Sequence, residues 1–266
     1  MARGMGIDPM QRRQPIDDPI DTARVGTRPA IVRKHRLSTR LWHWINALIV
    51  FVMLGSGFMI LNAHPHLYWG QFGANMDRPW FRVAWVFEGG RIPGWLTIPS
   101  TYNLALARRW HLTFALFMGF ALLAYMIVSL ANRHFRRDLN VTRAELSRRH
   151  LAHDIHEHLA LRFHDPARPG AYNILQKLTY IAVLFVLLPL AILTGLTMAP
   201  GINAAAPWML DLFGGRQSAR SLHFIVSIAI AAFTVLHVAL VILAGPVNEV
   251  RSMITGNWRS PREERR

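Results

Sequence analysis

The stretch that most restricts the folds open to this chain is residues 221–244, SLHFIVSIAIAAFTVLHVALVILA. It is apolar and uncharged, yet it contains His223 and His237. A helix needs about 20 apolar residues to cross the hydrocarbon core of a bilayer, so this stretch is long enough to span a membrane. A polar, titratable ring inside such a helix is costly unless it faces the protein interior and has a partner. The stretch therefore predicts a membrane-spanning helix whose two histidines have partners elsewhere in the chain.

The spacing of the two histidines indicates what kind of partner they have. They are fourteen residues apart, which in a helix is roughly 21 Å of rise and four turns less about 40°. His223 and His237 therefore lie on one helix face, one near each side of the membrane. Two imidazoles placed in this way meet the requirement of two haems bound one above the other.

Three further apolar stretches have the length of a membrane span, at about residues 41–60, 110–130 and 178–198. Pro189 lies inside the third stretch and is expected to kink it. We expect an all-α membrane protein, a four-helix transmembrane bundle with a long outer loop between helices one and two. The expected domains are a disordered basic tail at 1–32, the bundle at 33–258 and a charged tail at 259–266.

Composition agrees with a membrane protein, because 52% of the residues are hydrophobic and 17% are charged, whereas a soluble domain usually has about 25% charged residues. The chain has no cysteine, which excludes iron–sulfur clusters, thiolate-ligated haem, c-type haem attachment and disulfides. In a soluble protein the net charge of +15 would indicate nucleic acid. Here the basic residues flank apolar spans, so they are interpreted as topogenic and no nucleic-acid partner is expected.

The distribution of basic residues predicts the orientation in the membrane. Twenty-three Lys and Arg residues lie before the first span, between the second and third, and after the fourth, against seven in the other two loops. By the positive-inside rule both termini are expected to be cytoplasmic. The loop at residues 61–109, rich in Trp, Gly and Pro, then faces the periplasm. It is long for a connection between neighbouring helices, and we interpret it as a folded cap or a docking surface.

Depth in the membrane identifies the expected partners of the two histidines. His43 begins span one, at the depth of His237 near the inner surface, and His111 begins span two, at the depth of His223 near the outer surface. Each pair offers two neutral imidazoles across the bundle core, the axial arrangement of a low-spin b-type haem. Ligation by two histidines leaves no open iron position, which favours electron transfer over oxygen chemistry. Taken alone, a histidine beside tryptophan at a membrane surface is also explained as an interfacial anchor.

Arginines near both histidine pairs are candidates for binding haem propionates. Arg36 and Arg40 lie beside the inner pair, and Arg109 and Arg220 lie beside the outer pair. Guanidinium groups bind carboxylates through paired hydrogen bonds. Topogenic charge is an equally good explanation of each arginine taken singly.

The motifs RLWHWINA, RRWHLTF and SLHFIVSIAIAAFTVLHVAL resemble those of the cytochrome b561-type membrane subunits of nickel–iron hydrogenases and respiratory formate dehydrogenases. The resemblance covers about residues 33–258. It implies two b haems held by the histidine pairs above. It also implies exchange of electrons between a quinone pool and a peripheral enzyme on the outer face.

The resemblance also implies a quinone site near the inner haem, at the start of helix three. The matching stretch here is YNILQKLTY, in which Asn173, Gln176 and Lys177 are polar. The family often has a small residue where this chain has Leu175, so the pocket wall differs. A helix cap formed by Asn173, with Lys177 at the membrane interface, explains the same residues without quinone.

Two outer segments, the loop at 61–109 and the approach to helix four at 207–220, resemble a subgroup of these cytochromes associated with sulfite-oxidase-like molybdopterin enzymes. They are the expected docking face for a peripheral periplasmic redox partner, of molybdopterin or hydrogenase-like type. Membrane lipid and quinone or menaquinone are the other expected partners. Localisation in a bacterial inner membrane follows from the same resemblance.

The favoured function is that of a di-haem, quinone-reactive electron-transfer subunit of a respiratory oxidoreductase complex, with two haem b and exchangeable quinone. One alternative is a stand-alone membrane oxidoreductase that acts on a small outer substrate such as superoxide. The other is a non-redox transporter whose histidines bind a metal or a proton. Whether the chain is itself an enzyme stays open at this point.

Overall fold

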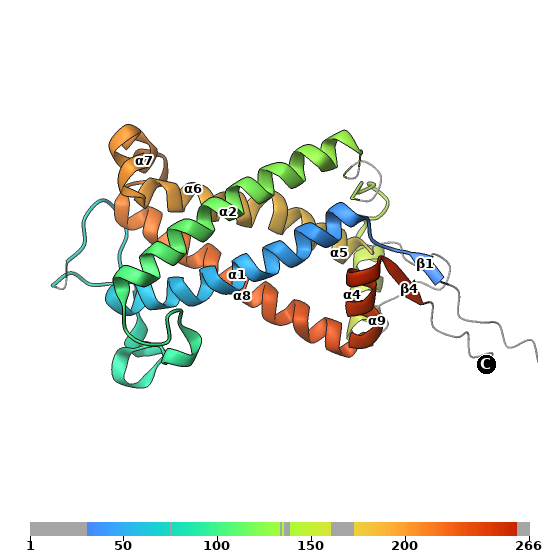
Figure 1. The fold of residues 1–266 in the computed structure, drawn as a ribbon, viewed down its shortest axis with the longest axis horizontal. Helices are drawn as coiled ribbons and strands as arrows, with labels where there is room; N and C mark the ends of the chain where they lie inside the picture. Colours follow the sequence, from blue (N-terminus) through green and yellow to red (C-terminus); the bar gives the residue numbers. More distant parts are fainter. Residues whose placement is uncertain (1–30, 75, 134, 136–138, 161–172, 260–266) are drawn as a thin grey trace, which may run out of the picture.

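Four long helices form the body of the molecule in the computed structural model, which describes residues 31–74, 76–133, 135, 139–160 and 173–259 (Figure 1). The helices are α1 (Leu37–Ala63), α2 (Leu104–Ala131), the succession α5 (Ile174–Ala182), η5 (Val183–Leu187) and α6 (Leu188–Met198), and α8 (Arg216–Leu243). Each is long and apolar enough to cross a membrane. The chain is therefore an all-α membrane protein built on four spans, and most of the two expected tails lies outside the described residues.

The helices are longer than the apolar stretches that predicted them, because their ends continue beyond the hydrocarbon core. Helix α2 begins at Leu104 instead of near residue 110, and the Asn103 side chain caps it by accepting a hydrogen bond of 2.9 Å from the backbone N–H of Leu106. This bond satisfies one of the amide groups that a helix start leaves unpaired. The first turns of the helices consequently carry the arginines that flank the spans.

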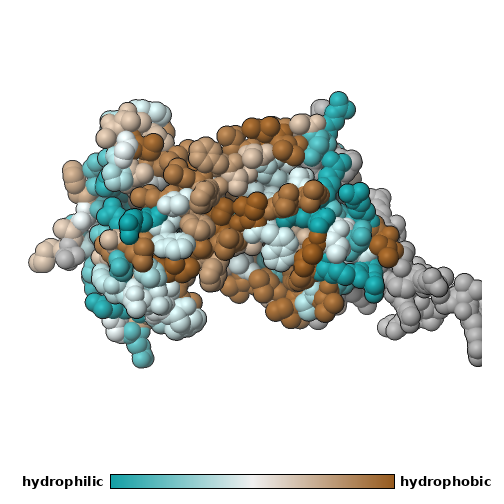
Figure 2. All heavy atoms as spheres, viewed as in Figure 1, coloured by the Kyte–Doolittle hydropathy of each residue, from teal (hydrophilic) through white to brown (hydrophobic). Residues whose placement is uncertain are grey.

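Apolar residues cover much of the middle of the face shown in Figure 2, and hydrophilic residues gather toward both ends. Phe51, Phe120 and Val235 are each about 70% exposed. In water such a surface would be unfavourable by about 25 cal/mol per Å² of apolar surface, so its natural surroundings are lipid tails.

The interior of the bundle is filled by apolar side chains from all four spans. Helix α1 packs along α2, and α6 packs along α8. Small hydroxyl residues such as Ser56, Ser129 and Thr194 are fully buried, as expected where membrane helices approach each other closely. The buried apolar cluster includes Ile49, Met118, Leu122, Leu188, Val226 and Ile230.

The third span is not a regular helix. Its middle, η5, is a π-helix, and α6 begins directly after it with Pro189 in its first turn. Proline has no amide hydrogen and its ring crowds the preceding turn, so the expected disturbance at Pro189 takes the form of a π-helical turn just before it.

The long loop between α1 and α2 is folded into a cap at one end of the bundle, which we call the loop end (Figure 1). Strand β2 (His66–Leu67) pairs antiparallel with β3 (Phe81–Arg82). The cap is tied to α8 by Trp80, whose indole N–H donates to Ser221 Oγ at 2.8 Å. The other loop-end elements are η2 (Val83–Trp85), η3 (Glu88–Gly90), η4 (Gly94–Leu96), α7 (Pro200–Ala205) and η6 (Pro207–Phe213).

The opposite end, which we call the terminal end, joins both ends of the chain. Strand β1 (Ile31–Arg33) pairs with β4 (Asn257–Arg259), and helix α9 (Pro246–Thr255) lies between α8 and β4 in the chain. Trp258 is 1% exposed and donates to Glu249, which also accepts from Lys34 at 3.2 Å. We call β1, α9 and β4 the terminal clasp, and the sequence analysis did not predict it.

The histidine-rich run after α2 forms helix α4 (Arg148–Leu159) at the terminal end. Its described histidines His150, His153 and His156 are exposed. Within the described part of the chain, no three His, Asp or Glu side chains are gathered as they would be around a metal ion.

Candidate functional site

The structure brings the four predicted histidines together in two pairs. His111 on α2 faces His223 on α8, with ring centres 6.0 Å apart and planes at 73°. His43 on α1 faces His237 on α8, with ring centres 6.1 Å apart and planes at 61°. We call the first the loop pair and the second the terminal pair, after the ends of the bundle near which they lie.

The separation within each pair suits an iron atom between the rings. A metal–imidazole nitrogen bond is about 2.0–2.1 Å long, and roughly 1.1 Å separates that nitrogen from the ring centre, so two axial imidazoles have centres about 6 Å apart. The observed values of 6.0 and 6.1 Å agree with this distance. The residues of each pair would therefore fit a haem between α8 and one helix of the α1–α2 hairpin.

Glycines give the loop-pair rings room. A methyl group added at Gly195 would lie 3.3 Å from Cε1 of His223, and one added at Gly57 would lie 3.5 Å from Cε1 of His111. Gly57 and Gly195 thus lie directly against the rings.

The loop-pair rings are also held by hydrogen bonds. Nδ1 of His111 lies 3.0 Å from Ser56 Oγ on α1. Nδ1 of His223 lies 3.0 Å from Thr194 Oγ1 on α6 and 3.0 Å from the carbonyl oxygen of Ala191. Sequence reasoning missed these two hydroxyl groups. The available signal was a hydroxyl residue directly before a glycine, since Ser56 precedes Gly57 and Thr194 precedes Gly195.

The terminal-pair rings are held differently. Nδ1 of His43 is buried and has no hydrogen-bond partner among the described residues. The ring contacts Trp44 edge-on at 5.0 Å, and Phe233 stacks on His237 at 5.7 Å and 23°. Aromatic neighbours rather than hydrogen bonds therefore orient this pair in the described structure.

Of the predicted arginines at the terminal end, Arg40 lies one turn before His43 on the same helix, with a buried Nε that has no hydrogen-bond partner among the described residues. Its guanidinium lies against Gly256 at the end of α9. Arg36 Nη1 lies 3.5 Å from the carbonyl oxygen of Asn132, at the limit of a hydrogen bond.

At the loop end, Arg220 lies one turn before His223 and donates to the carbonyl oxygen of His64 at 2.6 Å. Partial burial lowers the pKa of His64, and the positive charges of Arg220 and Arg108 lower it further. Arg108, three residues before His111, shares its face of α2, whereas Arg109, two residues before it, is turned away by about 200°. Helical spacing thus makes Arg108 a further candidate on the His111 face of α2.

The residues predicted for quinone take part in a helix cap and an ion pair. The Asn173 side chain accepts from the backbone N–H of Gln176 at 2.9 Å, and the Gln176 side chain accepts in return from Asn173, which is a capping box for α5. Lys177 bonds Glu145 at 2.6 Å and lowers the pKa of that carboxyl group to about 2. The cap weighed in the sequence analysis is present, and a quinone role for these residues stays a prediction.

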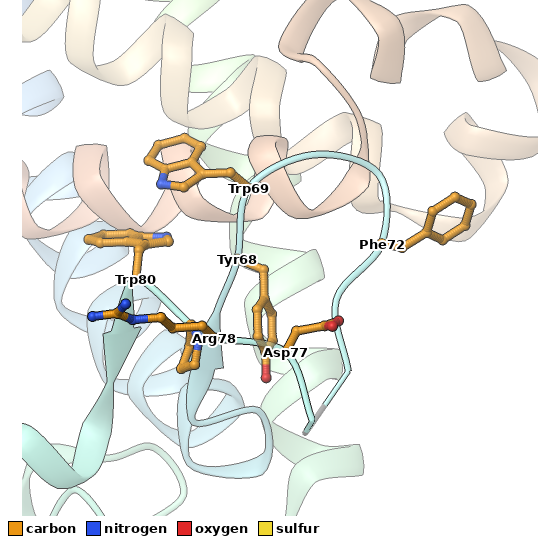
Figure 3. A pocket seen from close by; sticks show the side chains of 7 residues that line it. Tyr68, Trp69, Phe72, Asp77, Arg78 and Trp80 are labelled. Carbon is orange, nitrogen blue, oxygen red and sulfur yellow. The ribbon is translucent and has the colours of Figure 1, made fainter.

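A pocket of about 560 Å³ lies in the cap at the loop end, and none of the four paired histidines lines it (Figure 3). The rings of Trp69 and Trp80 are stacked at 5.5 Å beside it. The hydroxyl group of Tyr68 is buried without a hydrogen-bond partner among the described residues. The pocket is lined by Tyr68, Trp69, Phe72, Asp77, Arg78, Pro79 and Trp80.

Four membrane-spanning helices with two facing pairs of histidines at two heights define a b-type membrane cytochrome. The sequence model of the family "Prokaryotic cytochrome b561" matches residues 34–256. The chain belongs to this family, and it is therefore a haem b-containing, multi-pass membrane protein of bacterial type that transfers electrons.

Among curated proteins, the chain is 27% identical over 207 residues to "Putative protein-methionine-sulfoxide reductase subunit YedZ1" of Azospira oryzae. The match covers 77% of this chain and 87% of that protein. No solved structure matches the chain.

Proposed function

We propose that the protein binds two haem b groups, one between His111 and His223 and one between His43 and His237. The observation that supports this most directly is the equal spacing of the two ring pairs, 6.0 and 6.1 Å, along one face of α8. When bound, each haem supplies reversible one-electron transfer. The four imidazoles would supply two nitrogen ligands to each iron, which would leave no position for oxygen or a substrate.

We propose that arginines at each end neutralise the haem propionates. At the terminal end these are Arg40 and Arg36. Arg40 is favoured as the main group because its buried Nε has no hydrogen-bond partner among the described residues. At the loop end we favour Arg220 and Arg108 over the predicted Arg109, because helical spacing turns Arg109 about 200° away from His111. A guanidinium group that gains a carboxylate partner is stabilised by charge-assisted hydrogen bonds.

We propose that electrons pass between a quinone at the terminal end and a redox protein at the loop end. Asn173, Gln176 and Lys177 remain the candidate quinone residues, since they begin α5 at the terminal end. The excess of basic residues there supports a cytoplasmic position for both termini in a bacterial inner membrane.

We propose that the cap and η6 form the docking face for a peripheral enzyme of the sulfite-oxidase-like molybdopterin class. The similarity to a protein named as a reductase subunit supports a catalytic partner. The face is rich in exposed apolar side chains, among them Phe72 at 85%, Trp95 at 80% and Leu212 at 68% exposed. Exposed apolar patches of this kind mark interaction sites.

Haem analysis of the purified full chain tests the proposal. We expect two haem b per chain and a reduced b-type absorption band that develops when quinol is added. The His237→Ala variant should keep one haem and lose reduction by quinol. A chain without haem, or one haem per chain in the wild type, would contradict the two-haem proposal.

A further inference from the structure

The two hairpins of the bundle contain the same local arrangement around the loop pair. Ser56 and Gly57 on α1 contact the ring of His111, and Thr194 and Gly195 on α6 contact the ring of His223. In each case a hydroxyl group lies 3.0 Å from Nδ1, and a glycine removes the side chain that would displace the ring. The repetition on two unrelated stretches of sequence indicates that the hydroxyl groups serve the histidines.

The hydrogen-bond pattern around Thr194 determines which ring nitrogen of His223 carries its hydrogen. Thr194 Oγ1 lies 2.6 Å from the carbonyl oxygen of Leu190, which takes its one hydroxyl hydrogen. The hydroxyl oxygen must therefore accept from the ring. The Ala191 carbonyl oxygen lies 3.0 Å from the same Nδ1 and can only accept a hydrogen bond, so it independently requires a hydrogen on Nδ1. Nδ1 of His223 is a donor.

The same argument applies to His111. Ser56 Oγ donates to the carbonyl oxygen of Val52 at 2.6 Å, so it accepts from Nδ1 of the ring. Both loop-pair rings thus have Nδ1–H directed at a hydroxyl oxygen, and Nε2 keeps its lone pair for a metal.

We propose that Ser56 and Thr194 are positioning residues that fix the tautomer and the orientation of the loop-pair imidazoles and thereby lower the reduction potential of the haem bound between them. A hydrogen bond from the second ring nitrogen makes an imidazole more basic and a stronger ligand for ferric iron. This inference rests on the two-haem proposal above. It is confined to the loop pair, because Nδ1 of His43 has no such partner among the described residues.

The test is a redox titration of the two haems in the purified full-length protein carrying Thr194→Val or Ser56→Ala. Valine keeps the shape of threonine and removes the hydroxyl. We expect one midpoint potential to rise by the equivalent of about tenfold in the ferric-over-ferrous preference, which is about 59 mV for one electron, while the other midpoint is unchanged. The low-spin ferric EPR signal of the same haem should also shift.

Three controls make the result specific. Thr197→Val removes a hydroxyl that is equally buried but donates to the Thr194 backbone, and we expect no shift. Thr194→Ser and Ser56→Thr keep the hydroxyl and should restore the wild-type potential. If Thr194→Val loses its haem, the potentials of Ser56→Ala and of the two hydroxyl-retaining variants still show whether the hydroxyl groups lower the potential.

Two outcomes would overturn the inference while leaving two haems in place. One is an unchanged potential and EPR signal in both hydroxyl-free variants, and the other is a shift of equal size in Thr197→Val. A wild-type protein that contains no haem would instead contradict the proposed function, so the two failures are distinguishable.

Discussion

The two histidine pairs share helix α8 and nearly the same ring separation, but they differ in what holds the rings. At the loop pair, hydroxyl and carbonyl groups on α1 and α6 accept from both Nδ1 atoms. At the terminal pair, Trp44 and Phe233 contact the rings. Hydrogen bonds determine tautomer and direction, whereas ring contacts restrict orientation loosely. The comparison teaches that one backbone plan can surround two histidine pairs with different neighbours, hydrogen-bonding groups at one and aromatic rings at the other.

The supports of the two pairs also come from different parts of the chain. The loop pair has contacts from α1, α2, α6 and α8, and the cap is bonded to α8 at Ser221, two residues from His223. The terminal pair lies beside the terminal clasp, which joins residues from both ends of the chain. Changes in the clasp should therefore affect one pair only.

Replacing one histidine of a pair should have the largest effect, and it tests whether the two histidine pairs are independent. We expect His223→Ala and His237→Ala each to lower the haem content from two to one per chain, because each removes one of two axial ligands. Only His237→Ala should abolish reduction by quinol. Haem extraction and quinol-reduced spectra measure both effects, and loss of both haems in either variant would show that the sites fold together.

Removal of the clasp's buried tryptophan should weaken the terminal site alone. Trp258 is 1% exposed, and truncation of a buried tryptophan costs about 3–5 kcal/mol. We expect Trp258→Ala to lower the temperature at which the terminal haem is lost, with little change at the loop haem. Trp95→Ala, at a side chain 80% exposed, is the control and should leave both haems unchanged in thermal spectra.

The two neighbouring arginines of α2 offer a matched test of the loop end. Arg108→Gln should lower the midpoint potential of the loop haem, because a lost positive charge favours ferric iron. The effect should be on the order of 1 kcal/mol for charges roughly 12 Å apart at an effective dielectric constant of about 20. Arg109→Gln, on the opposite helix face, should change the potential less. Redox titration of both variants measures this, and equal shifts would contradict the placement of Arg108.

The smallest expected effect is the pH response of the ion pair near α5. The hydrogen bond from Lys177 lowers the pKa of Glu145 to about 2, below the ordinary value of 4.5. As the pH falls, the Glu145 carboxylate is protonated in the unfolded chain before it is protonated in the folded one. The Lys177–Glu145 pair therefore stabilises the fold above pH 4.5, and this contribution is lost as the pH falls from 4.5 towards 2.

Because both side chains are partly exposed, the contribution should be about 0.5–1 kcal/mol. Melting temperatures between pH 3 and 6 should show a shallower slope for Glu145→Gln than for the wild type. The same slope in both proteins would show that the pair contributes nothing.

Some features of the candidate site were predictable and others were not, for physical reasons. The heights of His43, His111, His223 and His237 follow from helical rise, so the pairs could be predicted from spacing and depth. The direction of a side chain on α2 depends on which face meets α8, so the choice between Arg108 and Arg109 as a propionate partner stays a prediction. The polar start of α5 was interpreted as either a quinone site or a cap, and the capping box of Asn173 and Gln176 is present.

The sequence by itself determined the four membrane spans, their chain order and the two levels at which histidines occur, because hydrophobic length and helical rise are local properties. Only the tertiary structure decided which hydroxyl groups reach the rings, and that the two ends of the chain pair as β1 and β4. These contacts join residues such as Thr194 and His223 that are distant along the chain, and distances between helices depend on how the helices pack.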